Sequence, residues 1–395
     1  MIIKADRIIT GDGKTVLENT ALVLEKGKIL ELGEIAKLRE KHKDKTVLEY
    51  PGASILPGLI DMHVHIGYVW NTPEGSAYND FMIAYYSGDY ARQAFAKGVT
   101  TMRDVSSPKN LCATMIQAAE KGYIKIPRII HTDLHICFTG GHAWDHSVEV
   151  DGPWQVRAAI RDAIKRGAHW IKIMASHRSD TPEYTQEELN AAVDECHRVK
   201  RKIAVHAGTQ PSIQMCIDAG FDTIEHGTYL TETQAKQMAD KGLVWVPTIV
   251  AFTFTHDRIK ESMERDNPAS VQAGFLEHHE YFQNAANAYR DNFEKLYKTG
   301  VKIAAGTDLV YPGREAAPIA EELILMVKYG MPVLEAIKAA TMTGAETLGM
   351  GERIGEIAPG KVADIAVING DPLKGVKALK NVREVFYSGE SVYKS

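Results

Sequence analysis

The chain has 395 residues, of which 45% are hydrophobic and 25% charged, and this composition suits a globular protein with one large domain and a smaller one. Its formal net charge of -5 is spread without long runs of one sign, which argues against a nucleic-acid or membrane partner and leaves small molecules as the expected partners. The N-terminus carries an acidic residue where a secretory signal would have its apolar core, so we expect a cytoplasmic protein.

Short strand-like runs separated by turn signals occupy both ends of the chain. They include Thr20–Leu24 within residues 1–55 and Ala363–Ile368 within residues 355–395. Neither end has enough strands to bury a core by itself. We therefore predict that the two ends join in one small β-sandwich domain.

Residues 56–354 alternate strand and helix signals. Helical stretches such as Gln155–Arg166 and Gln186–Lys200 separate most of the strands, which predicts parallel strands joined by crossover helices. Eight such units predict an α/β fold of the (β/α)8 TIM-barrel type, in which catalytic groups lie at the C-terminal ends of the strands. The predicted strands are Leu56–His65, Val99–Asp104, Arg128–Asp133, His169–Met174, Ile203–His206, Thr223–His226, Leu243–Pro247 and Val301–Asp308.

The first predicted strand ends in two histidines separated by one residue. Residues i and i+2 of a strand point to the same face, so His63 and His65 can aim both imidazoles into one metal site while Val64 packs on the other side. Two histidines that are simply hydrogen-bonded at a strand end remain an alternative.

Four further strands carry a polar residue of the same kind at or near their ends: Lys172, His206, His226 and Asp308. An unpaired ammonium in the apolar run around Lys172 would be costly, so this lysine forms a salt bridge with a barrel carboxylate, emerges at the strand tip, or has a chemical role. Taken singly, each histidine could be a core residue, and Asp308 could be the N-cap of the next helix. Together with His63 and His65 they make six such residues at five strand signals, which favours a common site.

With these residues in place, the sequence resembles the metal-dependent hydrolases of the amidohydrolase superfamily over nearly its whole length. The resemblance rests on Leu56–Asp61 leading into the two histidines, on the later lysine, histidines and aspartate, and on the closing Ile357–Ile365. It implies two divalent metal ions, for which we expect zinc. By the resemblance, His63, His65 and Asp308 bind the more buried metal, His206 and His226 bind the second, and Lys172, carbamylated by carbon dioxide, bridges the two.

This ligand set implies a hydrolytic reaction. Imidazole and carboxylate ligands suit zinc, and two metals close together lower the pKa of a bridging water so that hydroxide is available near neutral pH. The expected reaction is cleavage of a carbon–nitrogen amide bond by a metal-bridging hydroxide. Asp308 would take the proton and pass it to the leaving nitrogen.

The segments Gly140–His142 and Ile171–Ser176 resemble the prolidase-like and carboxypeptidase-like subgroup, which is related to the imidazolonepropionases and cleaves the bond before a C-terminal amino acid. The resemblance implies an N-acyl amino acid or dipeptide substrate, a role for His142 in polarising the substrate carbonyl, and a role for Tyr229 in holding the substrate carboxylate. A solvated loop histidine and a rim tyrosine remain alternatives. A homo-oligomer is also expected.

Two loops differ from the rest of the pattern. The loop Ser176–Glu183 is shorter and more charged than in many relatives, and our hypothesis is that Arg178 recognises a carboxylate. The aromatic insert Tyr68–Tyr78 is expected to form a loop over the barrel mouth.

Two other classes of function stay open. A mononuclear cyclic amidohydrolase or deaminase would use the same histidines and aspartate with one metal and no carbon dioxide. A non-catalytic metal-binding scaffold would keep the fold without turnover. Lys172 favours the two-metal hydrolase, because the resemblance implies that single-metal members generally lack this lysine.

Overall fold

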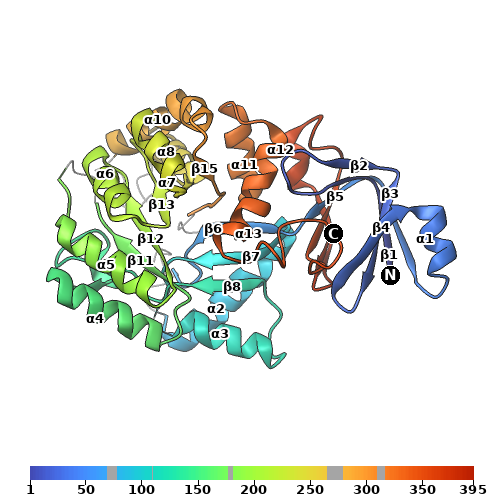
Figure 1. Ribbon diagram of the computed structural model, residues 1–395, viewed down its shortest axis with the longest axis horizontal. Helices are drawn as coiled ribbons and strands as arrows, with labels where there is room; N and C mark the ends of the chain where they lie inside the picture. The colour runs from blue at the N-terminus through green and yellow to red at the C-terminus, as the bar shows by residue number, and fades with distance from the viewer. Residues whose placement is uncertain (69–77, 109, 177–180, 265–278, 309–315) are drawn as a thin grey trace.

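The computed structural model describes the chain except residues 69–77, 109, 177–180, 265–278 and 309–315 (Figure 1). Arg178 and most of the insert Tyr68–Tyr78 therefore lie outside the described residues. The strands are β1 (Ile2–Ile9), β2 (Val16–Glu18), β3 (Thr20–Glu25), β4 (Lys28–Glu34), β5 (Val47–Pro57), β6 (Leu59–Val64), β7 (Val99–Asp104), β8 (Arg128–His131), β9 (Ile136–Cys137), β10 (Val148–Glu149), β11 (Trp170–Met174), β12 (Lys202–Ala207), β13 (Thr223–His226), β14 (Val244–Val246), β15 (Lys302–Ile303), β16 (Ile365–Asn369), β17 (Val382–Tyr387) and β18 (Glu390–Lys394). The α-helices are α1 (Ile35–Lys41), α2 (Asp80–Gln93), α3 (Leu111–Glu120), α4 (Gly152–Lys165), α5 (Gln186–Arg198), α6 (Gln210–Ala219), α7 (Glu232–Lys241), α8 (Ile249–Glu264), α10 (His279–Lys298), α11 (Ile319–Lys328), α12 (Val333–Ala339) and α13 (Met342–Thr347).

The two ends of the chain pair with each other in one eight-stranded sheet, ordered β18-β17-β16-β5-β1-β3-β4 with β2 on β1. The joint is the antiparallel pair β5 and β16, where Ile55 lies opposite Val367. Both termini lie at this sheet, on the right of Figure 1. The joining of the ends is as predicted, but the ladders form a single sheet, so a sandwich of two facing sheets is not confirmed. The division at residues 55/56 and 354/355 stays a prediction.

The middle of the chain forms two parallel sheets, one ordered β10-β9-β11-β12-β13-β14-β15 and one ordered β6-β7-β8. This confirms an α/β fold with parallel strands. Within the described residues the ladders do not close into a barrel. Backbone hydrogen bonds nevertheless join the two sheets at both seams, among them Met62 N to Ala305 O (2.9 Å) and His169 N to His131 O (2.9 Å).

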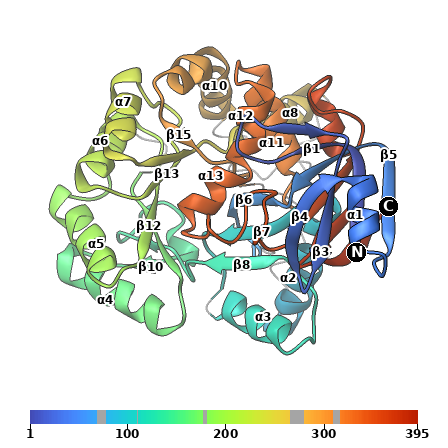
Figure 2. The same ribbon diagram turned by 45° about the vertical axis from the view of Figure 1, so that its right-hand side comes forward.

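Helices cover the outside of the larger parallel sheet, with α4, α5, α6 and α7 in sequence around its strands (Figures 1 and 2). Local sequence sets where they begin: α5 and α7 each start with a capping box, from Thr185 with Glu188 and from Thr231 with Gln234. In the described part of the chain, no helix has the length and apolar character needed to cross a membrane.

The eighth strand is the largest difference from the predicted elements. We predicted a strand through Asp308, but β15 ends at Ile303. After Ala304, the chain forms backbone hydrogen bonds with β6 and no longer with β14. Thr307 N and Asp308 N both donate to His63 O, at 3.3 and 2.8 Å. This switch of partner carries Asp308 to the end of β6.

Candidate metal centre

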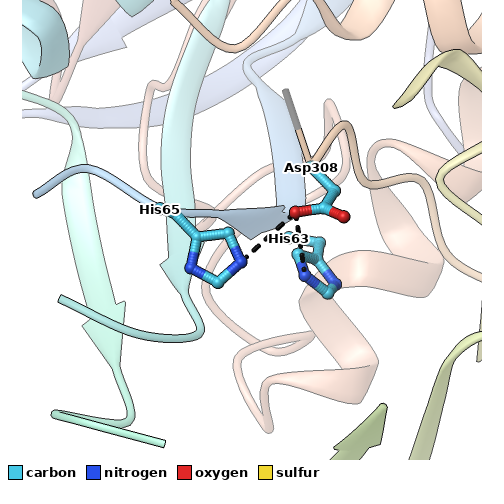
Figure 3. Close-up of side chains that lie close together, drawn as sticks. All are labelled: His63, His65 and Asp308. Atoms are coloured by element: carbon cyan, nitrogen blue, oxygen red, sulfur yellow. Dashed lines mark ion pairs between the residues drawn. The ribbon is translucent and has the colours of Figure 1, made fainter. Parts of the chain in front are cut away.

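Three predicted ligands meet at the end of β6. The Nε2 atoms of His63 and His65 lie 3.5 and 3.2 Å from the same carboxylate oxygen, Oδ1 of Asp308 (Figure 3). One ligand atom of each of the three residues lies within 4.8 Å of the others. Two imidazoles and a carboxylate in this arrangement form a donor set that suits zinc and similar divalent metals.

Both histidines of this group use the opposite ring nitrogen for a protein contact. His63 Nδ1 is 2.7 Å from Glu225 Oε2, and His65 Nδ1 is 3.1 Å from the carbonyl oxygen of Ser106. Because carboxylates and carbonyls only accept, each Nδ1 carries the proton and each Nε2 keeps its lone pair toward Asp308. Val64 between them is buried in the core, as the alternation along the strand predicts.

The remaining predicted histidines continue the cluster. The ring of His226 lies 4.9 Å from that of His63 and 4.5 Å from that of His206, measured between centroids. His226 Nδ1 also lies 3.9 Å from Asp308 Oδ2 and 2.8 Å from Thr248 Oγ1. Asp308 therefore has one oxygen toward the first pair of histidines and the other toward His226.

Lys172 lies on β11, which pairs with the strand β12 that carries His206, and it is 1% exposed. The described residues provide its Nζ with no hydrogen bond and no ion pair. Burial lowers the pKa of Lys172 to about 8, while Glu225 and Asp308 act to raise it. The salt bridge that we considered as an alternative is thus not found among these residues.

Two of the predicted ligands have a strained backbone. His226 and Asp308 have φ angles of 65° and 47°, in the left-handed region that residues with a side chain rarely occupy. Such residues cost on the order of 1–3 kcal/mol each and persist where the surroundings hold them in place. At His226, the carbonyl oxygen accepts from Trp245 Nε1 at 2.6 Å and from Tyr289 Oη at 3.0 Å.

The electrostatics of the cluster also fit a metal. Burial lowers the pKa of His63, His206 and His226, so these imidazoles are neutral, which is the form that binds metal. Burial alone would raise the pKa of Asp308, but the neighbouring histidines outweigh it and the net shift is downward. His63, His206 and His226 are therefore neutral imidazoles next to an ionised carboxylate.

Of the two predicted substrate-binding residues, His142 lies beside His206, and Tyr229 follows His226 by three residues in the chain. The His142 ring is 4.5 Å from the His206 ring, and its backbone N–H donates to Glu183 Oε2 at 3.2 Å. Tyr229 is half-buried and its ring lies 6.5 Å from that of Tyr281 on α10.

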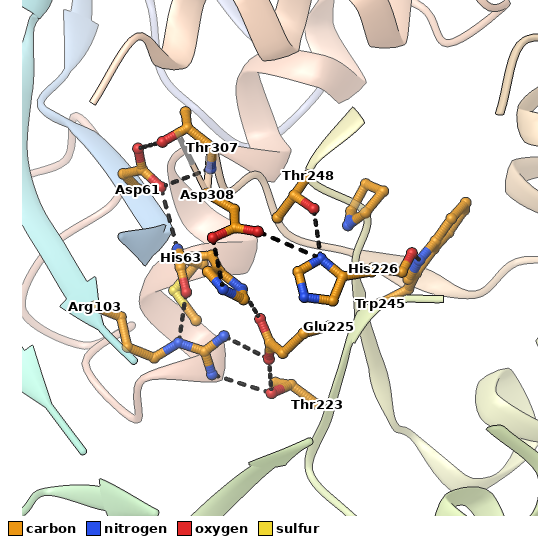
Figure 4. A network of polar contacts seen from close by, with 12 residues as sticks. Asp61, His63, Arg103, Thr223, Glu225, His226, Trp245, Thr248, Thr307 and Asp308 are labelled. Atoms are coloured by element: carbon orange, nitrogen blue, oxygen red, sulfur yellow. Dashed lines mark hydrogen bonds and ion pairs between the residues drawn. The ribbon is translucent and has the colours of Figure 1, made fainter. Parts of the chain in front are cut away.

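Sequence reasoning missed three buried charged residues that support the site (Figure 4). Asp61 accepts from His63 N and from Thr307 Oγ1, at 3.1 and 2.7 Å, and so links β6 to the segment before Asp308. Glu225 contacts His63, and Arg103 contacts Glu225 at 2.7 Å. The sequence could have indicated them, because each is a charged residue within a predicted buried strand, as Lys172 is.

The parallel sheets and this histidine–carboxylate cluster define an α/β protein with a candidate metal centre at its strand ends. The amidohydrolase family model matches residues 54–392, so the chain belongs to the amidohydrolase family. Ochratoxinase of Aspergillus niger is 28% identical over 97% of this chain and 84% of its own length. Imidazolonepropionase of Geobacillus thermodenitrificans is 22% identical over 90% of this chain and 84% of its own length.

A solved structure of a Xaa-Pro dipeptidase with bound methionine in the active site is similar along the whole chain. Its TM-score is 0.87 at 29% identity, and the match covers 100% of this chain and 99% of that one. Together with the family match, these similarities identify the protein as a metal-dependent hydrolase that acts on carbon–nitrogen bonds.

Proposed function

We propose that this chain is a binuclear metal-dependent amidohydrolase that cleaves an N-acyl amino acid or a dipeptide, in the manner of a prolidase. The observation that carries the proposal is the buried Lys172, which has no hydrogen bond or ion pair among the described residues. Besides burial, its charge acts to lower the pKa of His63, His206 and His226. An anionic oxygen ligand between these histidines would suit a second metal, and a carbamylated lysine would supply one.

Carbamylation removes the difficulty that an unpaired buried ammonium presents. The neutral amine of Lys172 attacks carbon dioxide, a nitrogen–carbon bond forms and one proton is released, which leaves an anionic carbamate with two oxygen donors. Burial favours the neutral amine that this step needs, because it lowers the pKa of Lys172 to about 8. The proposed ligands are then His63, His65 and Asp308 for one ion, His206 and His226 for the other, and Lys172 for both, and zinc suits this set.

Divalent ions held by these residues would make a water nucleophilic near neutral pH and polarise the scissile carbonyl. The protein's own part is proton transfer. Asp308 takes the proton on Oδ2, the oxygen that does not face His63 and His65, and returns it to the leaving nitrogen as the carbon–nitrogen bond breaks. Its side chain is 19% exposed, whereas His63 is almost fully buried, so Asp308 is the member of the group that a substrate reaches.

The substrate is held from the side of His206. His142 donates to the carbonyl oxygen next to the scissile bond, and Tyr229 donates to the carboxylate of the C-terminal amino acid. The contact between the His142 and His206 rings supports this placement. Relatives named as an ochratoxinase and as a Xaa-Pro dipeptidase support an amide bond next to an amino acid as the target.

The finer architecture belongs to the same proposal. The seam hydrogen bonds at Met62 and His169 support a (β/α)8 barrel of residues 56–354, with a small β-sandwich domain from residues 1–55 and 355–395. We further propose that the protein works in the cytoplasm as a homo-oligomer.

A metal and substrate screen tests the function. Protein loaded with zinc in bicarbonate buffer is analysed for bound metal and assayed on N-acyl amino acids, dipeptides and cyclic amides. We expect two metal ions per chain and release of a C-terminal amino acid. One ion per chain with turnover of cyclic amides, independent of bicarbonate, would instead support the mononuclear alternative, and no metal with no turnover would support the scaffold.

A further inference from the structure

Arg103 is a fully buried cation that the chemistry above does not use. It is the last residue but one of β7 and is 0% exposed. Its guanidinium donates from Nε to Met62 O at 2.6 Å, from Nη1 to Thr223 Oγ1 at 3.0 Å and from Nη2 to Glu225 Oε1 at 2.7 Å (Figure 4). The guanidinium also lies over the ring of Trp170, 4.8 Å from the centroid. These contacts fix it in one orientation.

The two carboxylate oxygens of Glu225 accept hydrogen bonds from different partners. Oε1 accepts from Arg103 and from Thr223, and Oε2 accepts from His63 Nδ1 at 2.7 Å. The position of the carboxylate is therefore set on one side by Arg103, and it sets the orientation of the His63 ring on the other. A buried carboxylate without a counter-charge would be costly, and Arg103 provides that charge.

Arg103 thus holds His63 at two points. Through Glu225 it fixes the ring, with the proton on Nδ1 and the lone pair of Nε2 directed toward Asp308. Through Met62 O it fixes the backbone immediately before His63. Both contacts come from one rigid side chain on the adjacent strand, which pairs with β6 in parallel.

We propose that Arg103 is a positioning residue for metal binding, which orients His63 through Glu225 and through the backbone carbonyl of Met62. The inference rests on the proposed function only in taking His63 as a metal ligand. It differs from a purely structural role, in which Arg103 would stabilise the fold and leave the affinity for metal unchanged.

The test measures zinc affinity by competition with a chromophoric chelator, and the thermal midpoint of the metal-free protein. The variants are Arg103→Met, Arg103→Lys, and the double variant Arg103→Met with Glu225→Met. Arg128→Met is the control. Arg128 lies on β8, the strand after β7, and also pairs with a carboxylate, that of Asp364 at 2.9 Å, but it contacts no candidate ligand in the described structure.

We expect Arg103→Met to bind zinc about 10- to 100-fold more weakly, as is typical when the partner of a ligating histidine is disturbed. The double variant removes both buried charges, so its midpoint should recover relative to Arg103→Met while its zinc affinity stays low. Arg103→Lys keeps the charge but not the three-way geometry and should lie between wild type and Arg103→Met. Arg128→Met should bind zinc as wild type does.

Wild-type affinity in Arg103→Met, or affinity that recovers together with the midpoint in the double variant, would overturn the inference. If Arg103→Met does not fold, the lysine variant and the double variant decide by the same criteria. A wild-type chain that binds no zinc would instead refute the proposed function, so the two failures are distinguishable.

Discussion

Asp308 donates its backbone N–H to the backbone carbonyl of His63 at 2.8 Å, and the two side chains face each other at the same place. This bond joins the segment after β15 to the end of β6 without involving the side chain of either residue, and Asp61 adds a second link through Thr307. The two groups are therefore held together by the backbone, and a change in either side chain tests its chemistry more than its position.

Asp308→Asn should keep the fold and lose most of the turnover. The amide preserves the shape of the side chain and the backbone bond to His63, but it cannot accept the proton of the nucleophile. General acid–base catalysis contributes about 10²- to 10⁴-fold, so we expect kcat to fall by that factor. Steady-state kinetics with metal analysis of the same sample measures this, and turnover at the wild-type rate would refute the proton-transfer role.

Lys172→Ala should bind fewer metal ions than wild type. The variant has no amine to carry the carbamate, so the bridging ligand is lost and turnover should fall by orders of magnitude. Metal titrations in carbon-dioxide-depleted buffer and in bicarbonate buffer provide the control. Wild type should gain metal and activity with bicarbonate and the variant should not. Equal responses of the two proteins would show that Lys172 is not carbamylated.

Much of the centre was predictable because its signals are local. The alternation along the strand placed His63 and His65 on one face and Val64 in the core. A lysine inside an apolar run marked Lys172, and a polar residue at the end of a run marked His226. Each of these inferences needs only a few consecutive residues. The strands predicted from such runs are largely those that form.

The supporting contacts were not predictable, because they join distant parts of the chain. Arg103 and Glu225 are 122 residues apart, and nothing in either strand indicates which buried charge meets which. The early end of β15 was not predicted either, because it depends on the backbone of residues 305–308 forming hydrogen bonds with β6 and none with β14. An apolar run predicts that a strand is buried, but it does not predict which other strand it will pair with.

Gly306→Ala should weaken both the fold and the metal site. A Cβ at this position would lie 2.8 Å from His63 Cβ and 2.8 Å from Val246 Cγ1, so His63 or the segment that carries Asp308 must move. We expect a loss of about 1–3 kcal/mol in the free energy of unfolding, together with weaker zinc binding.

Gly375→Ala is the matched control for that substitution. Gly375 has an extended backbone, with φ of -165°, and a Cβ there would have nothing within 4 Å. Denaturant unfolding of the metal-free proteins and chelator competition separate the two effects. Unchanged zinc affinity in Gly306→Ala would show that the close approach of this glycine to His63 does not set the metal site.

Tyr229→Phe should act on substrate binding and leave the chemical step intact. If the hydroxyl holds the substrate carboxylate, its loss removes a hydrogen bond to a charged group, which is worth about 1.5–3 kcal/mol, so KM should rise roughly 10- to 100-fold with little change in kcat. The comparison substrate is the same compound with its carboxylate converted to an amide. If the variant loses the same factor on both substrates, Tyr229 does not recognise the carboxylate.

His131 should make the fold sensitive to acid. The residue is 2% exposed, its Nδ1 has no hydrogen-bond partner in the described structure, and its ring lies edge-on to His169 at 4.9 Å. Burial, with a smaller contribution from the charge of His169, lowers the pKa of His131 to about 4. The unfolded chain has the ordinary value of about 6.5 and so binds a proton that the folded protein excludes between these two pH values.

The sign follows from the lowered pKa in the folded state. The contribution of His131 to stability is fully present well above pH 6.5 and is lost as the pH falls toward 4, by about 1.5 kcal/mol between pH 6.5 and pH 5. Urea unfolding of chelator-treated protein at both pH values measures this without interference from metal loss. His131→Phe and His131→Gln remove the titrating group, so both should show a shallower decline than wild type, whatever their stability at pH 7. A decline as steep as that of wild type in both variants would assign the acid sensitivity to other groups.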